Sequence, residues 1–282
     1  MKLNKKTADI FIPDGMDIEK ALKRTTHLAI GAHQDDLEIK DYHGIAECYN
    51  SDEKWFTGIV VTNGSGSART GQYKDYTDEE MQEVRREEQR KAAVIGKYAA
   101  QFQLNYPSSE VKDTSNPDVI DDLFTILKIA KPSVVYLHNL ADKHETHVAT
   151  ALRTITAIRK LPANERPDTL YGTEVWRDLD WLSDAEKIAL PANKYPELAS
   201  ELVEVFESQI AGGKRYDLAT KGRRLANATY HSSHAVDDCN ALIFAMDLTP
   251  LIKDENMDIK KFISDKIENF KLDTVEKITT LA

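Results

Sequence analysis

Short apolar segments alternate with longer amphipathic segments along most of the chain. The apolar segments are typical of strands buried on both faces of a parallel sheet, and they span 28–32, 57–62, 101–106, 133–138 and 169–176. Helical spacing of apolar residues predicts helices over 18–24, 37–49, 78–98, 116–130, 142–158, 197–210, 216–230 and 258–272. The pattern predicts an α/β fold, a single Rossmann-like domain over residues 1–282 whose mostly parallel sheet is flanked by helices.

A histidine and two adjacent carboxylates follow the first of these strands. His33, Asp35 and Asp36 come directly after the apolar segment 28–32. Ligands in open α/β sheets bind at the C-terminal edge of the strands, so we expect the active site there. Imidazole and carboxylate are good zinc ligands, and an unligated carboxylate beside them can move protons. The alternative is a strand-end turn capped by aspartate.

A second strand-to-helix junction also carries histidines. The strand 133–138 ends in His138, and Asp142 and Glu145 then form a D-x-x-E pattern that predicts a capped helix start. His144 and His147 are three residues apart, so they lie on one helix face at the same sheet edge. The letters H-E-T-H are one residue short of the H-E-x-x-H of zinc proteases. The two junctions together favour a metal site.

Two further features lie near this edge. The glycines of the loop 63–71 have neither the dinucleotide-binding spacing nor a P-loop lysine, so we expect an active-site loop and no nucleotide cradle. Arg85 and Glu88 interrupt the apolar stripe of the helix 78–98. They either form a surface ion pair, or the arginine points toward a ligand and is held by the glutamate.

Composition and charge narrow the class of partner. A net charge of −10 without a cluster of lysine and arginine argues against nucleic acid and anionic membranes as partners. The apolar residues 10–12 are too few for a signal-peptide core, and no segment approaches the length of a membrane span. Cys48 and Cys239 lack a C-x-x-C pattern, which indicates reduced thiols. We expect a cytoplasmic protein without membrane insertion, and homo-oligomer formation stays open.

The residues 32–36, Ala-His-Gln-Asp-Asp, resemble the A-H-P-D-D motif of the LmbE-like, or PIG-L, family of zinc-dependent N-acetylglucosaminyl deacetylases. By this resemblance His33, Asp36 and His147 are metal ligands for Zn²⁺, with another divalent metal left open. Asp35 is the general base, and His144 is a cation or donor that faces the developing oxyanion.

The resemblance extends over most of the chain. Thr62-Asn63-Gly64, the series Arg85, Glu88, Ala92 and Gly96, and the late H-x-S motif that begins at His231 occur in family order, and Arg85 and His231 are implied as substrate-binding residues. Gln34 replaces the motif's proline, Thr146 replaces the usual acid before the last histidine, and His234 stands where glutamine is common. These departures affect the substrate and the surroundings of the site more than the metal ligands.

The resemblance implies a zinc-dependent hydrolase that removes an N-acetyl group from an N-acetylglucosamine-type amino sugar or its conjugate, a small-molecule substrate. One alternative is an amidase that acts on a larger sugar conjugate. Another is a non-catalytic, zinc-containing sugar-binding protein, which has no need of an unligated Asp35 beside the metal.

Overall fold

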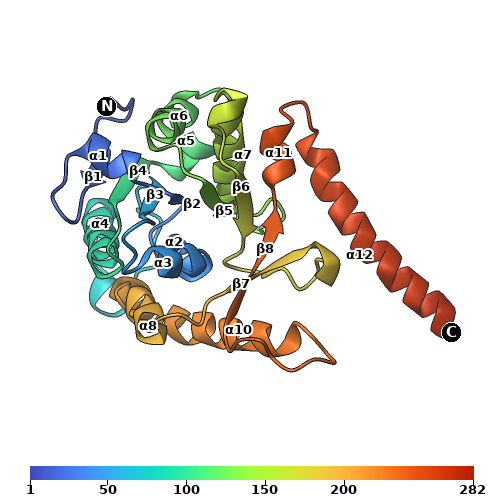
Figure 1. Cartoon of the computed structure of the whole chain (residues 1–282). Coiled ribbons are helices and arrows are strands. Elements are labelled where there is room, and N and C mark those ends of the chain that lie inside the picture. Colours follow the sequence, from blue (N-terminus) through green and yellow to red (C-terminus); the bar gives the residue numbers. More distant parts are fainter.

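A computed structural model describes residues 1–282 and contains one sheet of eight strands. The strand order is β1-β4-β3-β2-β5-β6-β8-β7 (Figure 1). Its five central strands are parallel: β4 (Ala100–Tyr106), β3 (Phe56–Thr62), β2 (His27–Gly31), β5 (Val134–His138) and β6 (Thr169–Thr173). Helices flank the sheet, so the predicted mostly parallel, Rossmann-like α/β fold is confirmed.

Three antiparallel strands at the two edges of the sheet were not predicted. β1 (Asp9–Phe11) pairs with β4, β8 (Leu242–Asp247) pairs with β6, and β7 (Lys187–Pro191) pairs with β8. β1 has only three residues and is followed by Pro13, and β7 ends in a proline that only an edge strand accommodates. Three residues give too little pattern for β1 to be recognised in the sequence, whereas β7 and β8, with five and six residues, are no shorter than β2, β5 and β6 and were missed.

Helices cover both faces of the sheet. Leu28 and Ile30 of β2 belong to a core of 33 buried residues, whereas Ala29, which points to the opposite face, belongs to a core of 19. The helices before α12 are α1 (Ile18–Lys23), α2 (Asp36–Lys40), α3 (Tyr42–Cys48), α4 (Asp78–Ile95), α5 (Ser108–Lys112), α6 (Asp118–Ala130), α7 (Glu145–Arg159), α8 (Pro196–Glu204), α9 (Glu207–Ala211), α10 (Tyr216–Tyr230) and α11 (Thr249–Lys253). Burial on both faces explains the uninterrupted apolar character of the central strands.

The prediction of one continuous helix over 37–49 is wrong. It is divided at Asp41 into α2 and α3. Asp41 is buried, and its carboxylate accepts hydrogen bonds from Lys40 Nζ at 2.5 Å and from Thr173 Oγ1 at 2.6 Å. A contact with a residue of β6 thus fixes the break, and no local pattern could reveal it. The predicted helix 197–210 is likewise divided into α8 and α9.

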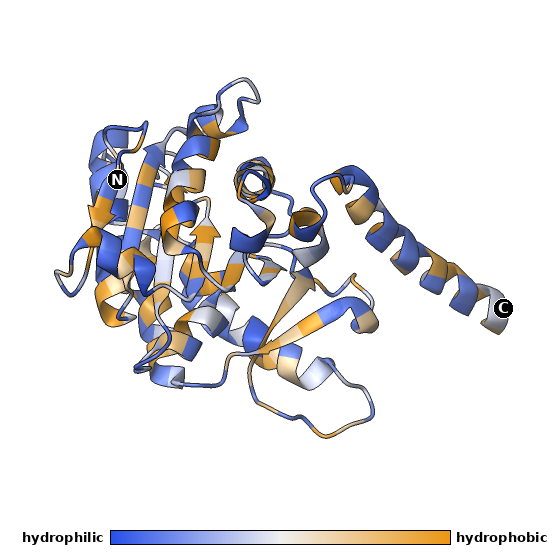
Figure 2. Cartoon of the chain, turned by 45° about the horizontal axis from the view of Figure 1, so that its top comes forward, coloured by the Kyte–Doolittle hydropathy of each residue, from blue (hydrophilic) through white to orange (hydrophobic).

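The last helix, α12 (Ile259–Leu281), is longer than the predicted 258–272 and projects from the rest of the molecule (Figure 1). Its first turns pack Ile259, Phe262 and Ile263 against the larger core. Farther along, Ile267 is 50% exposed, and the helix shows separate hydrophobic turns on a mainly hydrophilic surface (Figure 2). None of the helices combines the length and apolar composition needed to cross a bilayer.

Candidate active site

One cavity lies at the C-terminal edge of the parallel strands. It has a volume of about 410 Å³ and is bordered by the loop that follows β3. Six of the seven residues that the sequence proposed for the site line it: His33, Asp35, Asp36, Arg85, His144 and His147. The topology brings them together because β2 pairs in parallel with both β3 and β5, so the ends of these strands face the same side.

The turn between β2 and α2 presents the two carboxylates. Asp35 has a φ of 86°, in the left-handed region that few non-glycine residues adopt, and Asp36 opens α2. Asp36 Oδ2 accepts a hydrogen bond from the backbone N–H of His33 at 2.7 Å. A Cβ atom on Gly31 would lie 2.9 Å from Asp36 Cβ, so a glycine at the end of β2 permits this close approach. Strain of this kind is common at functional sites.

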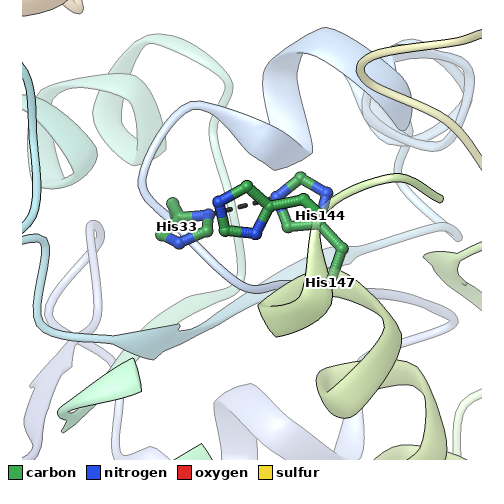
Figure 3. Close-up of side chains that lie close together, drawn as sticks. All are labelled: His33, His144 and His147. Atoms are coloured by element: carbon green, nitrogen blue, oxygen red, sulfur yellow. Dashed lines mark hydrogen bonds between the residues drawn. The ribbon is translucent and has the colours of Figure 1, made fainter. Parts of the chain in front are cut away.

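His147 is oriented by an aspartate. Its Nδ1 donates to Asp142 Oδ2 at 2.8 Å, which leaves the lone pair of Nε2 facing the cavity side of the ring. Nε2 lies 3.1 Å from His33 Nδ1 (Figure 3). It also lies 3.6 Å from Asp36 Oδ1. The predicted capping role of Asp142 is therefore wrong. α7 begins at Glu145 with His144 at its N-cap, and Asp142 binds the backbone N–H of His144 and the ring of His147 instead.

The hydrogen-bond partners of Asp142 determine its pKa and the position of the His147 proton. Burial alone would raise the pKa of Asp142, but hydrogen bonds from His147 and Glu174 outweigh it and lower the pKa to about 2. Burial, reinforced by Asp142, raises the pKa of Glu174 to about 7. Asp142 therefore stays ionised and keeps the proton of His147 on Nδ1.

The separations fit a tetrahedral metal centre. His33 Nδ1 and His147 Nε2 are 3.1 Å apart, and Asp36 oxygens lie 3.6 Å from each of them. Ligands held about 2.0–2.2 Å from a tetrahedral zinc are about 3.3–3.6 Å from one another. Two imidazoles and one carboxylate are a donor set that suits zinc, so these three residues could hold it.

His138, at the end of β5, is the buried neighbour that the sequence did not assign to the site. Its Nε2 lies 2.9 Å from the backbone N–H of Ala32, which can only donate, so this nitrogen is an acceptor and the proton is on Nδ1. The ring stacks on His147 with centroids 3.9 Å apart. Burial and the neighbouring His147 hold the pKa of His138 well below its usual value. His138 Nε2 also lies 3.2 Å from Asp36 Oδ2, and Asp36, His138 and His147 form a cluster that could hold a metal ion. The bond from Ala32 already uses the Nε2 lone pair, which favours His33 over His138 as the third member of the set.

Arg85 contacts Asp35. One guanidinium nitrogen lies 2.8 Å from Asp35 Oδ2, another lies 3.0 Å from Glu88, and only 2% of the arginine is exposed. The ion pair therefore exists but is buried, so its predicted surface position is wrong. The contact of Arg85 with a ligand stays a prediction. Burial, opposed by Arg85 and reinforced by Asp36, raises the pKa of Asp35 to about 6.

His144 and His231 differ in position. The His144 ring centroid lies 5.0 Å from that of His33 and 4.6 Å from that of His147, and burial together with these rings lowers the pKa of His144. A neutral donor is thus favoured over a cation. His231 lies just after α10, whereas Tyr216, at the start of α10, lines the cavity. The 15 residues of α10 separate the two by about 22 Å, so His231 does not reach the cavity.

Comparisons with known proteins find one family model and several similar structures. Residues 28–158 match the family model PIG-L, described as GlcNAc-PI de-N-acetylase. An N,N'-diacetylchitobiose deacetylase from Pyrococcus horikoshii has 16% sequence identity and a TM-score of 0.62, over 85% of this chain and 90% of that chain. The pseudoaglycone deacetylase Dbv21 has 15% identity and a TM-score of 0.57, over 79% of this chain and 97% of that chain.

The same fold also occurs in the 4-carboxy-2-hydroxymuconate hydratase GalB from Pseudomonas putida, with 14% identity and a TM-score of 0.62 over 79% of this chain and 96% of that chain. No curated protein sequence matches the chain. The matched residues 28–158 contain both histidine-bearing strand-to-helix junctions, so this part of the chain is similar to the PIG-L family.

Proposed function

We propose that the protein is a metal-dependent hydrolase that removes the N-acetyl group from an N-acetylglucosamine-type amino sugar or its conjugate. The family match and the deacetylases among the similar structures support the reaction class. The observation that carries the proposal is the arrangement around His147. Asp142 fixes its tautomer, His33 and Asp36 lie beside its Nε2, and Asp35 remains outside this ligand set.

We propose His33, Asp36 and His147 as the ligands of Zn²⁺. When bound, zinc polarises the amide carbonyl and lowers the pKa of a coordinated water from 15.7 to about 7. Asp36 suits a ligand because His147, together with a hydrogen bond from His33, outweighs the effect of burial and holds the pKa of Asp36 well below the usual value, so it is ionised without a metal.

Asp35 is the proposed general base and acid. Arg85 binds its Oδ2, whereas Oδ1 has no hydrogen-bond partner in the protein. A carboxylate with a pKa of about 6 can accept a proton from the attacking water near neutral pH and then deliver it to the departing nitrogen. Since the guanidinium of Arg85 is used by Asp35 and Glu88, we propose that Arg85 acts on the reaction by holding Asp35.

His144 is the proposed oxyanion donor. It sits at the N-cap of α7, and its ring lies next to His33 and His147. A neutral imidazole N–H aimed at the acyl oxygen stabilises the negative charge that develops there in the transition state.

A panel of N-acetylglucosamine derivatives, with released acetate and free amine measured with and without added zinc, tests the proposal. Asp35→Asn is expected to retain zinc and to lose about 10²–10⁴-fold in kcat, the usual contribution of a positioned acid–base group. Asp52→Asn, at an exposed position, is the matched control. Full turnover by zinc-loaded Asp35→Asn would contradict the mechanism.

The same panel separates the other candidate functions. Release of a larger acid in place of acetate would indicate an amidase that acts on bulkier conjugates. Binding without turnover would indicate a sugar-binding protein. Because GalB, a hydratase, shares the fold, the fold alone does not select hydrolysis, and water addition to an unsaturated acid belongs in the panel.

A further inference from the structure

The projecting part of α12 carries a row of exposed apolar side chains on one face. In Figure 1 this part of the helix extends away from the sheet and from the helices that cover it. The four apolar members of the row are between 44% and 86% exposed: Ile267, Phe270, Ile278 and Leu281. Single exposed apolar residues are common on protein surfaces, whereas a continuous row of them marks an interaction surface. We call these four residues, together with Thr274 between them, the α12 stripe.

The α12 stripe continues a row that already packs inside the protein. Ile259 and Ile263 lie on the same face of the helix, and both pack against the larger core at the start of α12. From Ile259 to Leu281 the row recurs in steps of four, four and three residues, an 11-residue repeat that stays on one face of a nearly straight helix. At 1.5 Å per residue the exposed part of the row is about 21 Å long. The pattern that buries the first turns of α12 thus extends well beyond the part that is buried.

The spacing of the α12 stripe is the same in both directions along the helix. Its five members are separated by three, four, four and three residues. An antiparallel pair of identical helices therefore matches the stripe position by position, with Thr274 on the two-fold axis. Phe270 of each helix then lies opposite Ile278 of the other, and Ile267 lies opposite Leu281. Such self-complementarity is what an interface between two identical subunits requires.

The charges beside the stripe favour the same pairing. Asp273 and Lys277 lie on one flank of the stripe, on either side of Thr274, and form an ion pair at 2.6 Å within the helix. In an antiparallel pair the same flanks of the two helices face each other. Asp273 of each helix then lies within one turn of Lys277 of the other, so each charge gains a second opposite charge. Ion pairs of this kind across a helix pair set its orientation.

A membrane surface fits the stripe less well than a second copy of the helix. Helices that lie on membranes are rich in lysine and arginine on the polar face, where these residues bind anionic lipids. In α12 four of the five lysines pair with carboxylates instead: Lys261, Lys266, Lys271 and Lys277. The net charge of −10 of the whole chain also repels anionic lipids.

We propose that the protein forms a two-fold symmetric dimer in which the α12 stripes of two copies pack against each other in antiparallel orientation. The inference does not depend on the proposed function. Because α12 joins the rest of the molecule at its N-terminal end, antiparallel packing places the two sheets at opposite ends of the helix pair. A single helix pair gives an interface at the small end of the range for specific complexes, so we expect a dissociation constant on the order of 1–100 µM.

Sedimentation equilibrium tests the dimer. Between about 1 and 200 µM, the range that brackets such a dissociation constant, the wild-type chain is expected to change from 31.8 kDa to twice that mass. Ile278→Asp, which places a charge in the stripe, is expected to weaken the dimer at least about tenfold. Leu272→Asp is the matched control, because Leu272 is exposed to a similar extent, 56% against 62% for Ile278, but lies on a different face of α12. It should dimerise as the wild type does.

A mixing experiment tests the antiparallel orientation. Phe270→Lys and Ile278→Asp are each expected to be monomeric when alone at concentrations where the wild type is dimeric. In an equal mixture of the two variants, the introduced lysine of one chain lies opposite the introduced aspartate of the other, and the remaining Ile278 lies opposite the remaining Phe270. The mixture should therefore form a heterodimer at least about tenfold more tightly than either variant associates with itself. Parallel packing places position 270 opposite position 270 and gives no such recovery.

Three results would overturn the proposal. The first is a wild-type chain that stays monomeric over the whole concentration range, and the second is a dimer whose dissociation constant is the same in Ile278→Asp. The third is binding of the monomeric wild type to vesicles of phosphatidylcholine and phosphatidylserine that is lost in Ile278→Asp, which would assign the stripe to a membrane surface. A dimer that Ile278→Asp weakens but that the mixture does not restore would overturn the antiparallel orientation. Circular dichroism of each variant checks that α12 remains helical.

Discussion

Asp142→Ala is expected to weaken zinc binding without removing a ligand. In the wild-type protein the His147 Nδ1 proton is donated to Asp142 over 2.8 Å, and the two side chains are 1% and 0% exposed. Removal of the acceptor leaves a buried N–H unpaired, at a cost of about 1–3 kcal/mol, which corresponds to about a 5–150-fold loss of affinity. Because no solvent reaches the pair, we expect a loss of about 10–100-fold, as is typical for partners of metal-binding histidines.

Competition with a chromophoric chelator measures the zinc dissociation constants. Asp142→Asn keeps a carbonyl acceptor near Nδ1, so its loss should be smaller than that of Asp142→Ala. The matched control is Glu145→Ala, three residues away, whose carboxylate is exposed and lies 3.4 Å from Lys112. It should change the affinity by less than twofold. Zinc binding by Asp142→Ala within twofold of the wild type would refute the reasoning.

Three further changes test other parts of the structure. Arg85→Gln should lower kcat by about 10–100-fold and change KM less, because the arginine makes a buried charge-assisted contact with Asp35, worth about 1.5–3 kcal/mol. Lys40→Met should lower the free energy of unfolding by about 3–5 kcal/mol, measured in urea, because it leaves Asp41 as an unpaired buried charge. Burial lowers the pKa of His27 to about 4, so the unfolded chain binds its proton at higher pH than the folded one. Stability is therefore lost as the pH falls from 6.5 toward 4, and His27→Gln should remove about 1–2 kcal/mol of the decrease between pH 7 and pH 5.

Each of these changes has a contradicting outcome. A rise in KM with unchanged kcat in Arg85→Gln would show that Arg85 binds the substrate directly and does not act through Asp35. Lys261→Met, which breaks an exposed pair with Asp265, is the control for Lys40→Met, and equal effects of the two would contradict the role of burial. A pH dependence of unfolding that is the same in His27→Gln and in the wild type would show that other groups control it.

The position of the candidate site could be predicted because its signals are local. A buried apolar strand that ends in polar side chains marks a sheet edge, and the segments before His33 and before His138 both have this form. The register of β2 with β5, in which His27 lies opposite Val134, then brings the two junctions together. Sequence alone suffices where the strand pattern and the rule for parallel sheets determine the arrangement.

The role of Asp142 could not be predicted because two local arrangements compete for one carboxylate. The D-x-x-E pattern fits a helix cap, but the carboxylate also reaches the ring of His147, five residues later. Which contact forms depends on where α7 begins, and Glu145, at its first turn, extends toward Lys112 and makes no cap. The contact of Arg85 with Asp35 could not be predicted either, because Asp35 is 50 residues away in sequence and no local pattern links the two residues.

Adjacent aspartates can take different roles here because their surroundings differ. Asp36 is enclosed by His33, His138 and His147, and the groups of His147 and His33 favour its ionised form and hold its pKa well below the usual value. Asp35, one residue earlier, is turned away by its left-handed backbone, and burial raises its pKa to about 6 although Arg85 opposes the shift. Two titratable groups whose environments separate their pKa values are the pattern expected of a ligand beside a proton carrier. A protein that only bound a sugar would gain nothing from a strained turn that holds a second carboxylate with this pKa, and this argues for catalysis.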